Sequence, residues 1–291
     1  MYRPRRMHRL TSPLALLVCV LALVACEEGA QHAQQEIIQT HARRVQEIVR
    51  DDLQRGVRGV EQAGTKLARG FLVEDPERRQ REMRTALHLL RQPPRGIQEL
   101  MISPISFVAA VDANGIVVAR DAEPDPMAGF DAGEAFPMVR RALQEGWSGY
   151  ELEEFPALIP DQPPSQTVLY VAPARTRDGR IVGAVLAGTP LWRTAQRVGR
   201  QLQADQASEI SEGLILWVYL YRGDQLHHHG TPADLDTIVP DAAARNAGFA
   251  RSPGGFTGEV AQFGRWYAYG VVPLPRIADD VGAVIFRSDP P

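Results

Sequence analysis

The feature that most constrains the fold of this chain is a series of strand-like segments that occurs twice in the same order. Each series starts with an apolar strand, a glycine-containing turn and a return strand, and it ends with two further apolar strands joined by a turn. The first series occupies 106–120, 149–153 and 167–187, and the second occupies 214–229, 258–260 and 266–285. Similarity that preserves order predicts two copies of one unit built on an antiparallel sheet. Chance matching of apolar strands is the alternative.

A long amphipathic helix precedes the two series. Apolar residues recur at spacings of mostly three and four from about Gln31 to Leu72, which is the period of one helix face. Gly56, Gly59 and Gly64 lower the helix propensity of this segment, and we interpret them as a surface where another backbone packs closely. A second helix is predicted to begin at Asp75-Pro76. Two further helices are predicted, a short one at about 135–144 that ends at Gly146 and one at about 191–211. The predicted fold class is therefore α+β.

This order of elements resembles the double Cache sensors, in which two PAS-like units are stacked along a long N-terminal helix. The residues that carry the resemblance are 111–119, with a hydrophobic-Asp-x-x-Gly hairpin, and 172–183, which match the family's Pro-containing strand pair. The resemblance covers about 31–288. It implies a first, membrane-distal unit at 31–191 and a smaller second unit, with its connecting helix, at 192–291.

The resemblance also implies that the first unit binds a small molecule between its sheet and a covering segment at 128–146. The ligand-binding candidates that follow are Arg120, Phe130, Phe136, Arg140, Tyr150 and Tyr170. The alternative is that Phe136 and Tyr170 belong to the core and that Arg140 is solvated. The Arg-x-Trp-Tyr cluster of amino-acid-binding members is absent here, and Thr189 stands where an aspartate is common. We therefore expect a small organic anion, bound through arginine, rather than an amino acid.

The N-terminus has the pattern of a bacterial lipoprotein signal peptide. Four arginines precede an apolar run of 13–25, which is too short to span a membrane as a helix. Leu23-Val24-Ala25-Cys26 resembles the lipobox, which implies cleavage of 1–25, lipidation of Cys26 and a short tether at 26–30. Glu27 in place of an aspartate favours the outer membrane slightly. An ordinary signal peptide and an uncleaved anchor are the alternatives.

Charge and motif content exclude several other functions. Removing 1–25 takes away four of the 32 basic residues and none of the 35 acidic ones, which leaves a net charge of −7. A chain of this charge is poorly suited to nucleic acid. It has no nucleophile motif and no glycine loop for phosphate, so we expect neither catalysis nor a cofactor. The run 227–229 consists of three histidines, two of which would share a strand face, but we assign no metal site.

The function that these features predict is that of a lipid-anchored, extracytoplasmic sensor module, which binds a small molecule and acts through another envelope protein. Two alternatives stay open. One is a structural or assembly lipoprotein without a small ligand, and the other is a metal-handling lipoprotein that uses the histidine run.

Overall fold

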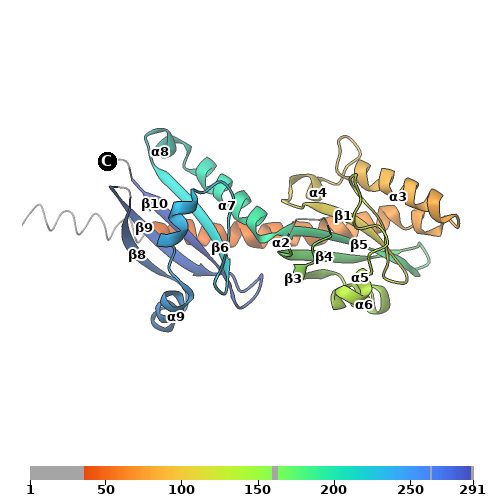
Figure 1. The fold of residues 1–291 in the computed structure, drawn as a ribbon. Coiled ribbons are helices and arrows are strands. Elements are labelled where there is room, and N and C mark those ends of the chain that lie inside the picture. The colour runs from red at the N-terminus through yellow and green to blue at the C-terminus, as the bar shows by residue number, and fades with distance from the viewer. Residues whose placement is uncertain (1–35, 159–162, 263, 290–291) are drawn as a thin grey trace, which may run out of the picture.

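One N-terminal helical segment runs past both halves of the molecule (Figure 1). The protein is represented by a computed structural model that describes residues 36–158, 163–262 and 264–289. The segment starts as the π-helix η1 (Ile37–Ala42), continues as α2 (Arg43–Leu67) and ends in the 3-10 turn η2 (Gly70–Leu72). The predicted long helix is present, and its expected start at Gln31 lies outside the described residues.

The glycines of α2 allow the first sheet to approach the helix backbone. A Cβ atom built on Gly56 would lie 2.2 Å from the ring of Tyr170, and one built on Gly64 would lie 2.6 Å from the carbonyl oxygen of Pro173. At Gly59 the same atom would meet Leu100 at 2.6 Å. These separations are shorter than any normal carbon contact, so the close packing is possible only because glycine has no side chain.

The second predicted helix is α3 (Pro76–Leu90), and it begins as its sequence predicts. The Asp75 side chain caps it by accepting a hydrogen bond from the backbone N–H of Arg78 at 2.6 Å, and Pro76 occupies the first turn. The apolar face of α3, with Met83, Leu87 and Leu90, is buried. The short helix α4 (Gln98–Ile102) follows it.

The first sheet has five antiparallel strands in the order β2-β1-β5-β4-β3. Their bounds are β1 Phe107–Asp112, β2 Val117–Arg120, β3 Gly149–Phe155, β4 Ser165–Arg175 and β5 Ile181–Pro190. Two short helices, α5 (Ala132–Ala135) and α6 (Pro137–Glu145), cover one of its faces. The predicted end of α6 at Gly146 is confirmed, since this residue has φ +71° and terminates the helix in the left-handed region.

The second sheet repeats the topology of the first, with the order β7-β6-β10-β9-β8. Its strands are β6 Ile215–Arg222, β7 Gln225–His227, β8 Phe256–Gln262, β9 Arg265–Pro273 and β10 Val281–Ser288. The helices of this half are α7 (Leu191–Asp205), α8 (Ala207–Ser211), the 3-10 helix η3 (Ala233–Ile238) and α9 (Ala242–Arg251). The α+β fold with two PAS-like units is confirmed.

Local differences from the predicted elements have simple causes. The helix expected over 191–211 is interrupted at Gln206, which has φ −115° and separates α7 from α8. The return strand expected to reach His229 ends at His227, because His228 and His229 turn away to bond Asp236 and Gln196. Helices α4, α5, α9 and η3 were not predicted, since each is short and carries a weak apolar period.

Strand alternation gives the first sheet two separate apolar faces. Val168, Tyr170 and Ala172 of β4 belong to the core cluster that packs against α2, whereas Leu169 and Val171 belong to the cluster under α5 and α6. Successive strand residues point to opposite faces, so neighbours in sequence enter different environments.

The two halves are tied together at a waist, the narrow region that α2 and α7 cross (Figure 1). There the Nε atom of Arg197 on α7 lies 3.7 Å from the Asp52 carboxylate on α2. Arg222, at the end of β6, donates to the side-chain oxygen of Gln166 on β4 and to Asp280 at 3.0 Å. Within the described ranges, none of the helices combines the length and the apolar character that crossing a membrane requires.

Candidate functional site

A cavity of about 150 Å³ lies at the end of the first sheet that faces the waist. The start of β1, the end of β2, the end of β3, the start of β4 and the end of β5 meet there. The residues that line it are Ser106, Phe107, Arg120, Pro126, Met127, Phe155, Pro156, Ala157, Leu158, Pro163, Ser165, Thr167 and Pro190. This set is mostly apolar and aromatic, with one charged side chain, which is the usual make-up of a small-molecule site.

Arg120 is the single charged residue among the described residues of the lining. It is the last residue of β2 and pairs with Ala109 of β1, whose side chain lies on the α5–α6 face of the sheet. Its side chain is 19% exposed, and its buried Nε atom has no hydrogen-bond partner among the described residues. A buried donor without a partner is unfavourable, so this N–H is available to a ligand acceptor.

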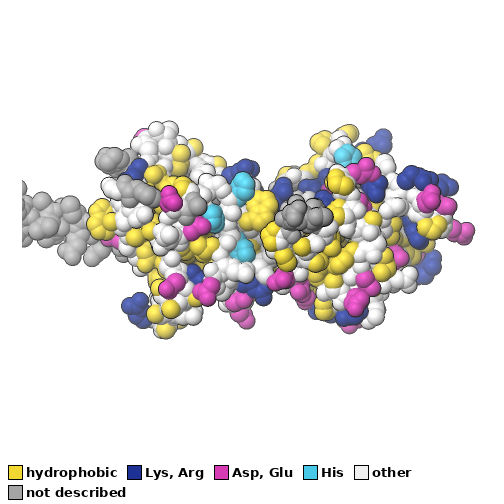
Figure 2. All heavy atoms as spheres, in the orientation of Figure 1, with side chains coloured by type: hydrophobic (Ala, Val, Ile, Leu, Met, Phe, Trp, Pro, Cys, Tyr) yellow, Lys and Arg dark blue, Asp and Glu magenta, His cyan; other side chains and the backbone are white. Residues whose placement is uncertain are grey.

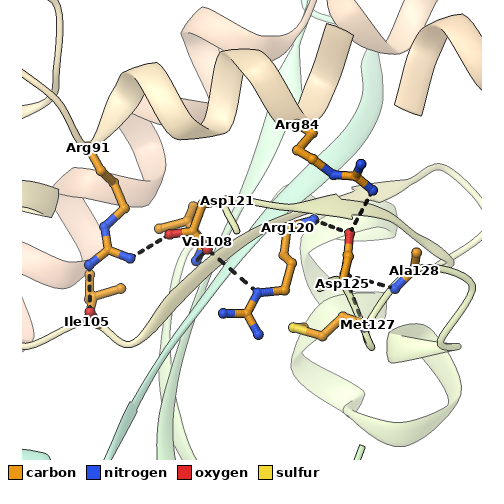
Figure 3. A network of polar contacts seen from close by, with 9 residues as sticks. All are labelled: Arg84, Arg91, Ile105, Val108, Arg120, Asp121, Asp125, Met127 and Ala128. Atoms are coloured by element: carbon orange, nitrogen blue, oxygen red, sulfur yellow. Dashed lines mark hydrogen bonds and ion pairs between the residues drawn. The ribbon is translucent and has the colours of Figure 1, made fainter. Parts of the chain in front are cut away.

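Two buried aspartates hold the backbone around Arg120 (Figure 3). Asp125 accepts the backbone N–H of Arg120 at 2.9 Å and those of Met127 and Ala128 at 3.1 Å each. Asp121 accepts the backbone N–H of Val108 at 3.2 Å. These bonds fix the strand end and the following turn.

Arginines on α3 pair with the same two aspartates. Arg91 donates to Asp121 and to the carbonyl oxygen of Ile105, and Arg84 lies 3.6 Å from Asp125. The Arg120 Nε atom lies 3.9 Å from Asp121, too far for a hydrogen bond. The aspartates are therefore already hydrogen-bonded to α3 and to backbone, and Arg120, which lines the cavity, has only a long ion pair with Asp121 among the described residues.

Aromatic rings form one wall of the cavity and extend behind it. Phe107 and Phe155 line the cavity with ring centroids 5.1 Å apart. Phe136 stacks behind Phe155 at 5.8 Å, and Phe130 lies 6.0 Å beyond Phe136. The predicted residues Phe130 and Phe136 thus support the wall from the side of α5 and α6, and neither is among the lining residues.

Hydroxyl groups supply the remaining polar atoms. The Ser106 Oγ atom is buried and has no hydrogen-bond partner among the described residues. Ser165 and Thr167 on β4 bond to each other at 3.0 Å. Ser106 can therefore donate to or accept from a bound molecule without breaking an existing bond.

The predicted residues Tyr150 and Tyr170 lie on the other face of the first sheet. They are directly paired across β3 and β4, and their ring centroids are 6.2 Å apart. Tyr170 is buried against Gly56 of α2, and burial followed by the nearby Asp52 charge raises the pKa of its hydroxyl. The structure therefore does not bring these tyrosines together with Arg120.

Arg140 is exposed on α6 and is not among the cavity-lining residues. Its neighbour Arg141 contacts Glu151 and lies over the ring of Trp147 at 4.1 Å. Of the predicted ligand residues, the cavity includes only Arg120.

Sequence reasoning missed Ser106, Phe107, Phe155 and Thr167. One signal for them was available, because Phe107 and Phe155 stand at strand ends next to loops, where ligand-contacting residues concentrate. The missing information was which alternate residues of each strand face α2 and which face α5 and α6.

The three histidines of the second half point to three different places. His228 bonds Asp236 at 3.2 Å and also contacts Thr231, while His229 bonds Gln196 at 2.9 Å. The Nε2 atom of His227 is buried without a partner, and burial is the main cause that lowers the pKa of this side chain. In the described part of the chain, no three His, Cys, Asp or Glu side chains form a group suited to a metal ion.

Comparison with known proteins identifies the fold. No protein-family model matches the sequence. No curated protein matches it either. Among solved structures, the sensory domain of the Campylobacter jejuni chemoreceptor Tlp3 with isoleucine bound is 11% identical, with a TM-score of 0.58, and the match covers 90% of this chain and 95% of that one.

A histidine kinase gives a second match. The DctB sensor domain of V. cholerae is 12% identical with a TM-score of 0.51, and the match covers 90% of this chain and 98% of that one. An extracellular ligand binding receptor from Desulfohalobium retbaense is 13% identical at a TM-score of 0.44, and this chain spans 40% of its length. The resemblance to the double Cache sensor fold is confirmed by the first two structures.

Proposed function

We propose that this chain is a non-enzymatic, extracytoplasmic sensor whose first unit binds a small organic anion in the Arg120 cavity. The observation that carries the proposal is that Arg120 and Ser106 line the same cavity, and that neither the Arg120 Nε–H nor the Ser106 hydroxyl has a hydrogen bond among the described residues. An anion that accepts from both groups would satisfy them together. Charge-assisted hydrogen bonds of this kind are shorter and stronger than neutral ones.

The composition and size of the cavity support an anion of few atoms. Among the described residues that line the cavity there is no Asp or Glu, so this part of the lining offers an ammonium group no counter-charge. The volume of about 150 Å³ is below the range of about 300–1,000 Å³ that is typical of drug-sized ligands. The isoleucine bound by the Tlp3 sensory domain shows that this fold accommodates small ligands in one relative.

We propose further that lipidated Cys26 holds the protein on a membrane and that an envelope protein receives the signal. The units would be 31–191 and 192–291, with a route between them at Gln166. This residue stands between the cavity-lining Ser165 and Thr167, and it accepts a hydrogen bond from Arg222 of the second half. Movement of the start of β4 on ligand binding would therefore reach the second sheet through a direct contact.

A thermal-shift screen tests the ligand class. We expect small carboxylates, such as lactate, pyruvate and succinate, to raise the melting temperature of the full chain, and amines to leave it unchanged. Ligand at about one hundred times its Kd adds about 2.7 kcal/mol, which is a shift of roughly 2–4 °C for a chain of this size. In Arg120→Ala the shift should disappear.

Arg177→Ala is the matched control, because this arginine is exposed in the turn between β4 and β5 and lies outside the cavity. It should keep the full shift. Arg140→Ala tests the other predicted arginine. Hits that are restricted to amines, or carboxylate hits that survive Arg120→Ala, would contradict the proposal.

A further inference from the structure

One edge of β6 is only partly covered by its neighbouring strand. On one side β6 pairs with β10 over its whole length, from Ile215 to Arg222. On the other side β7 pairs only with Leu220, Tyr221 and Arg222. In the described part of the chain, the first five residues of β6 therefore have no strand beside them at this edge, and an open edge is a template for another extended chain.

The hydrogen-bond pattern shows which backbone groups point to the open edge. The backbone N–H of Gly223 donates to the Asp280 carbonyl at 3.4 Å, so alternate residues from Gly223 towards the start of β6 bond to β10. Leu216 and Val218 then face away from β10. The Leu216 carbonyl accepts the side-chain amide of Gln203 at 3.0 Å.

Val218 has no such substitute partner. Among the hydrogen bonds of the described residues, none reaches its N–H or C=O at this edge. The residue is 4% exposed. Buried backbone groups are nearly always paired in native proteins, so an unpaired donor and acceptor side by side indicate an unfilled position in the sheet.

A groove of about 350 Å³ adjoins this position. The groove exists because the chain stops pairing with β6 after His227, the last residue of β7, and crosses to α7. There His229 bonds Gln196 at 2.9 Å, and its ring centroid lies 5.4 Å from that of Trp192. Gly199 leaves the α7 side open, since a Cβ atom there would meet only Val218, at 3.9 Å. Figure 2 shows histidine side chains on this face of the second half, beside the waist.

The α7 wall of the groove is positively charged. Arg200 lines the groove, is exposed, and has no ion-pair partner in the described ranges. Arg193, two turns earlier on the same helix, lies outside the groove lining and also has no ion-pair partner in the described ranges. Burial and the neighbouring charges of Arg91 and Arg200 lower the pKa of Arg193. An occupant with negative charge would therefore be favoured over a neutral or basic one.

We propose that this groove binds an extended acidic segment of a partner protein, which adds to the second sheet as a strand opposite Val218 and places a carboxylate against Arg200. A peptide backbone supplies an acceptor for the Val218 N–H and a donor for its C=O. Alternate side chains of an added strand share one face. The proposal is independent of the Arg120 cavity.

The test is fluorescence anisotropy with the full chain and labelled hexapeptides. The probe is Glu-Val-Glu-Val-Glu-Val, acetylated and amidated at its ends. One matched peptide has lysine in place of every glutamate, and a second has proline in place of the central valine and so lacks one ladder N–H. We expect the acidic peptide to bind at least tenfold more tightly than either. Hydrogen exchange at the Val218 amide should slow when it is added.

Variants of α7 separate this mode from others. Arg200→Glu should weaken binding at least tenfold, and Gly199→Met should abolish it by filling the groove without lowering the melting temperature. Arg58→Glu, which changes an exposed arginine of α2, is the matched control and should bind normally.

Four results would overturn the proposal. They are no binding of the acidic peptide at millimolar concentration, equal binding of the proline peptide, full competition by free glutamate, and self-association of the chain that Gly199→Met abolishes. The third would assign the groove to a small anion, and the fourth would assign it to a second copy of this chain.

Discussion

At the scale of single residues, Asp52 of α2 is a buried carboxylate. Its carboxylate is 4% exposed, accepts from Arg55 at 3.1 Å and has a second oxygen without a hydrogen bond. Burial raises its pKa above the ordinary 3.8, and the charges of Arg197 and Arg55 offset this only in part. The negative charge of Asp52 is also the second cause, after burial, that raises the pKa of the Tyr170 hydroxyl.

The raised pKa of Asp52 predicts a specific pH dependence of stability. Between the ordinary and the raised pKa the folded state binds more protons than the unfolded state, so stability falls as pH rises through this window. We expect Asp52→Asn to have a higher free energy of unfolding than the wild type at pH 7. The difference should vanish as pH falls below 3.8, where both side chains are neutral. Urea denaturation between pH 3 and pH 7 measures it, and a lower stability of Asp52→Asn at pH 7 would show that the ion pairs dominate.

At the scale of elements, the spacing between α2 and the first sheet is set by glycines. Gly64→Ala should destabilise the protein by about 1–3 kcal/mol, because the new methyl group meets the backbone of Pro173, which cannot rotate away. Gly199→Ala on α7 is the matched change, since its methyl group would have normal contacts. It should stabilise the protein by up to about 1 kcal/mol through helix propensity. Denaturant unfolding of the two variants checks this, and equal effects would show that close packing at Gly64 is unimportant.

At the scale of the whole molecule, two sheets of identical strand order share one long helix and meet at the waist. The proposed anchor would tether this assembly from its N-terminus, in residues outside those described. We expect Cys26→Ser to release the protein from the membrane fraction or to leave the precursor uncut, because acyl chains supply the membrane affinity at about 0.8 kcal/mol per buried methylene. Fractionation and intact mass measure this. A Cys26→Ser protein that stays membrane-bound at the mature size would contradict the lipid anchor.

Local pattern was sufficient to predict the strands and the longer helices α2, α3, α6 and α7, in their order. The period of α2, the Asp75 cap of α3, the Gly146 end of α6 and the repeated strand series are all properties of neighbouring residues, so they could be read without knowing what packs where. Arg120, which ends a hairpin at the sheet edge, is among the residues that line the cavity, and its part in ligand binding stays a prediction.

Tertiary structure alone decided which face each strand residue joins. Tyr170 looks like a pocket residue in the sequence, yet it packs on Gly56 of α2, while Phe155 and Ser106, which no motif marks, form the cavity. The side chains of a strand alternate with a period of two, so a pattern shows that two faces exist but not which partner covers each. The open edge at Val218 has the same origin. It follows from where β7 leaves the sheet, and that depends on contacts of His229 with α7.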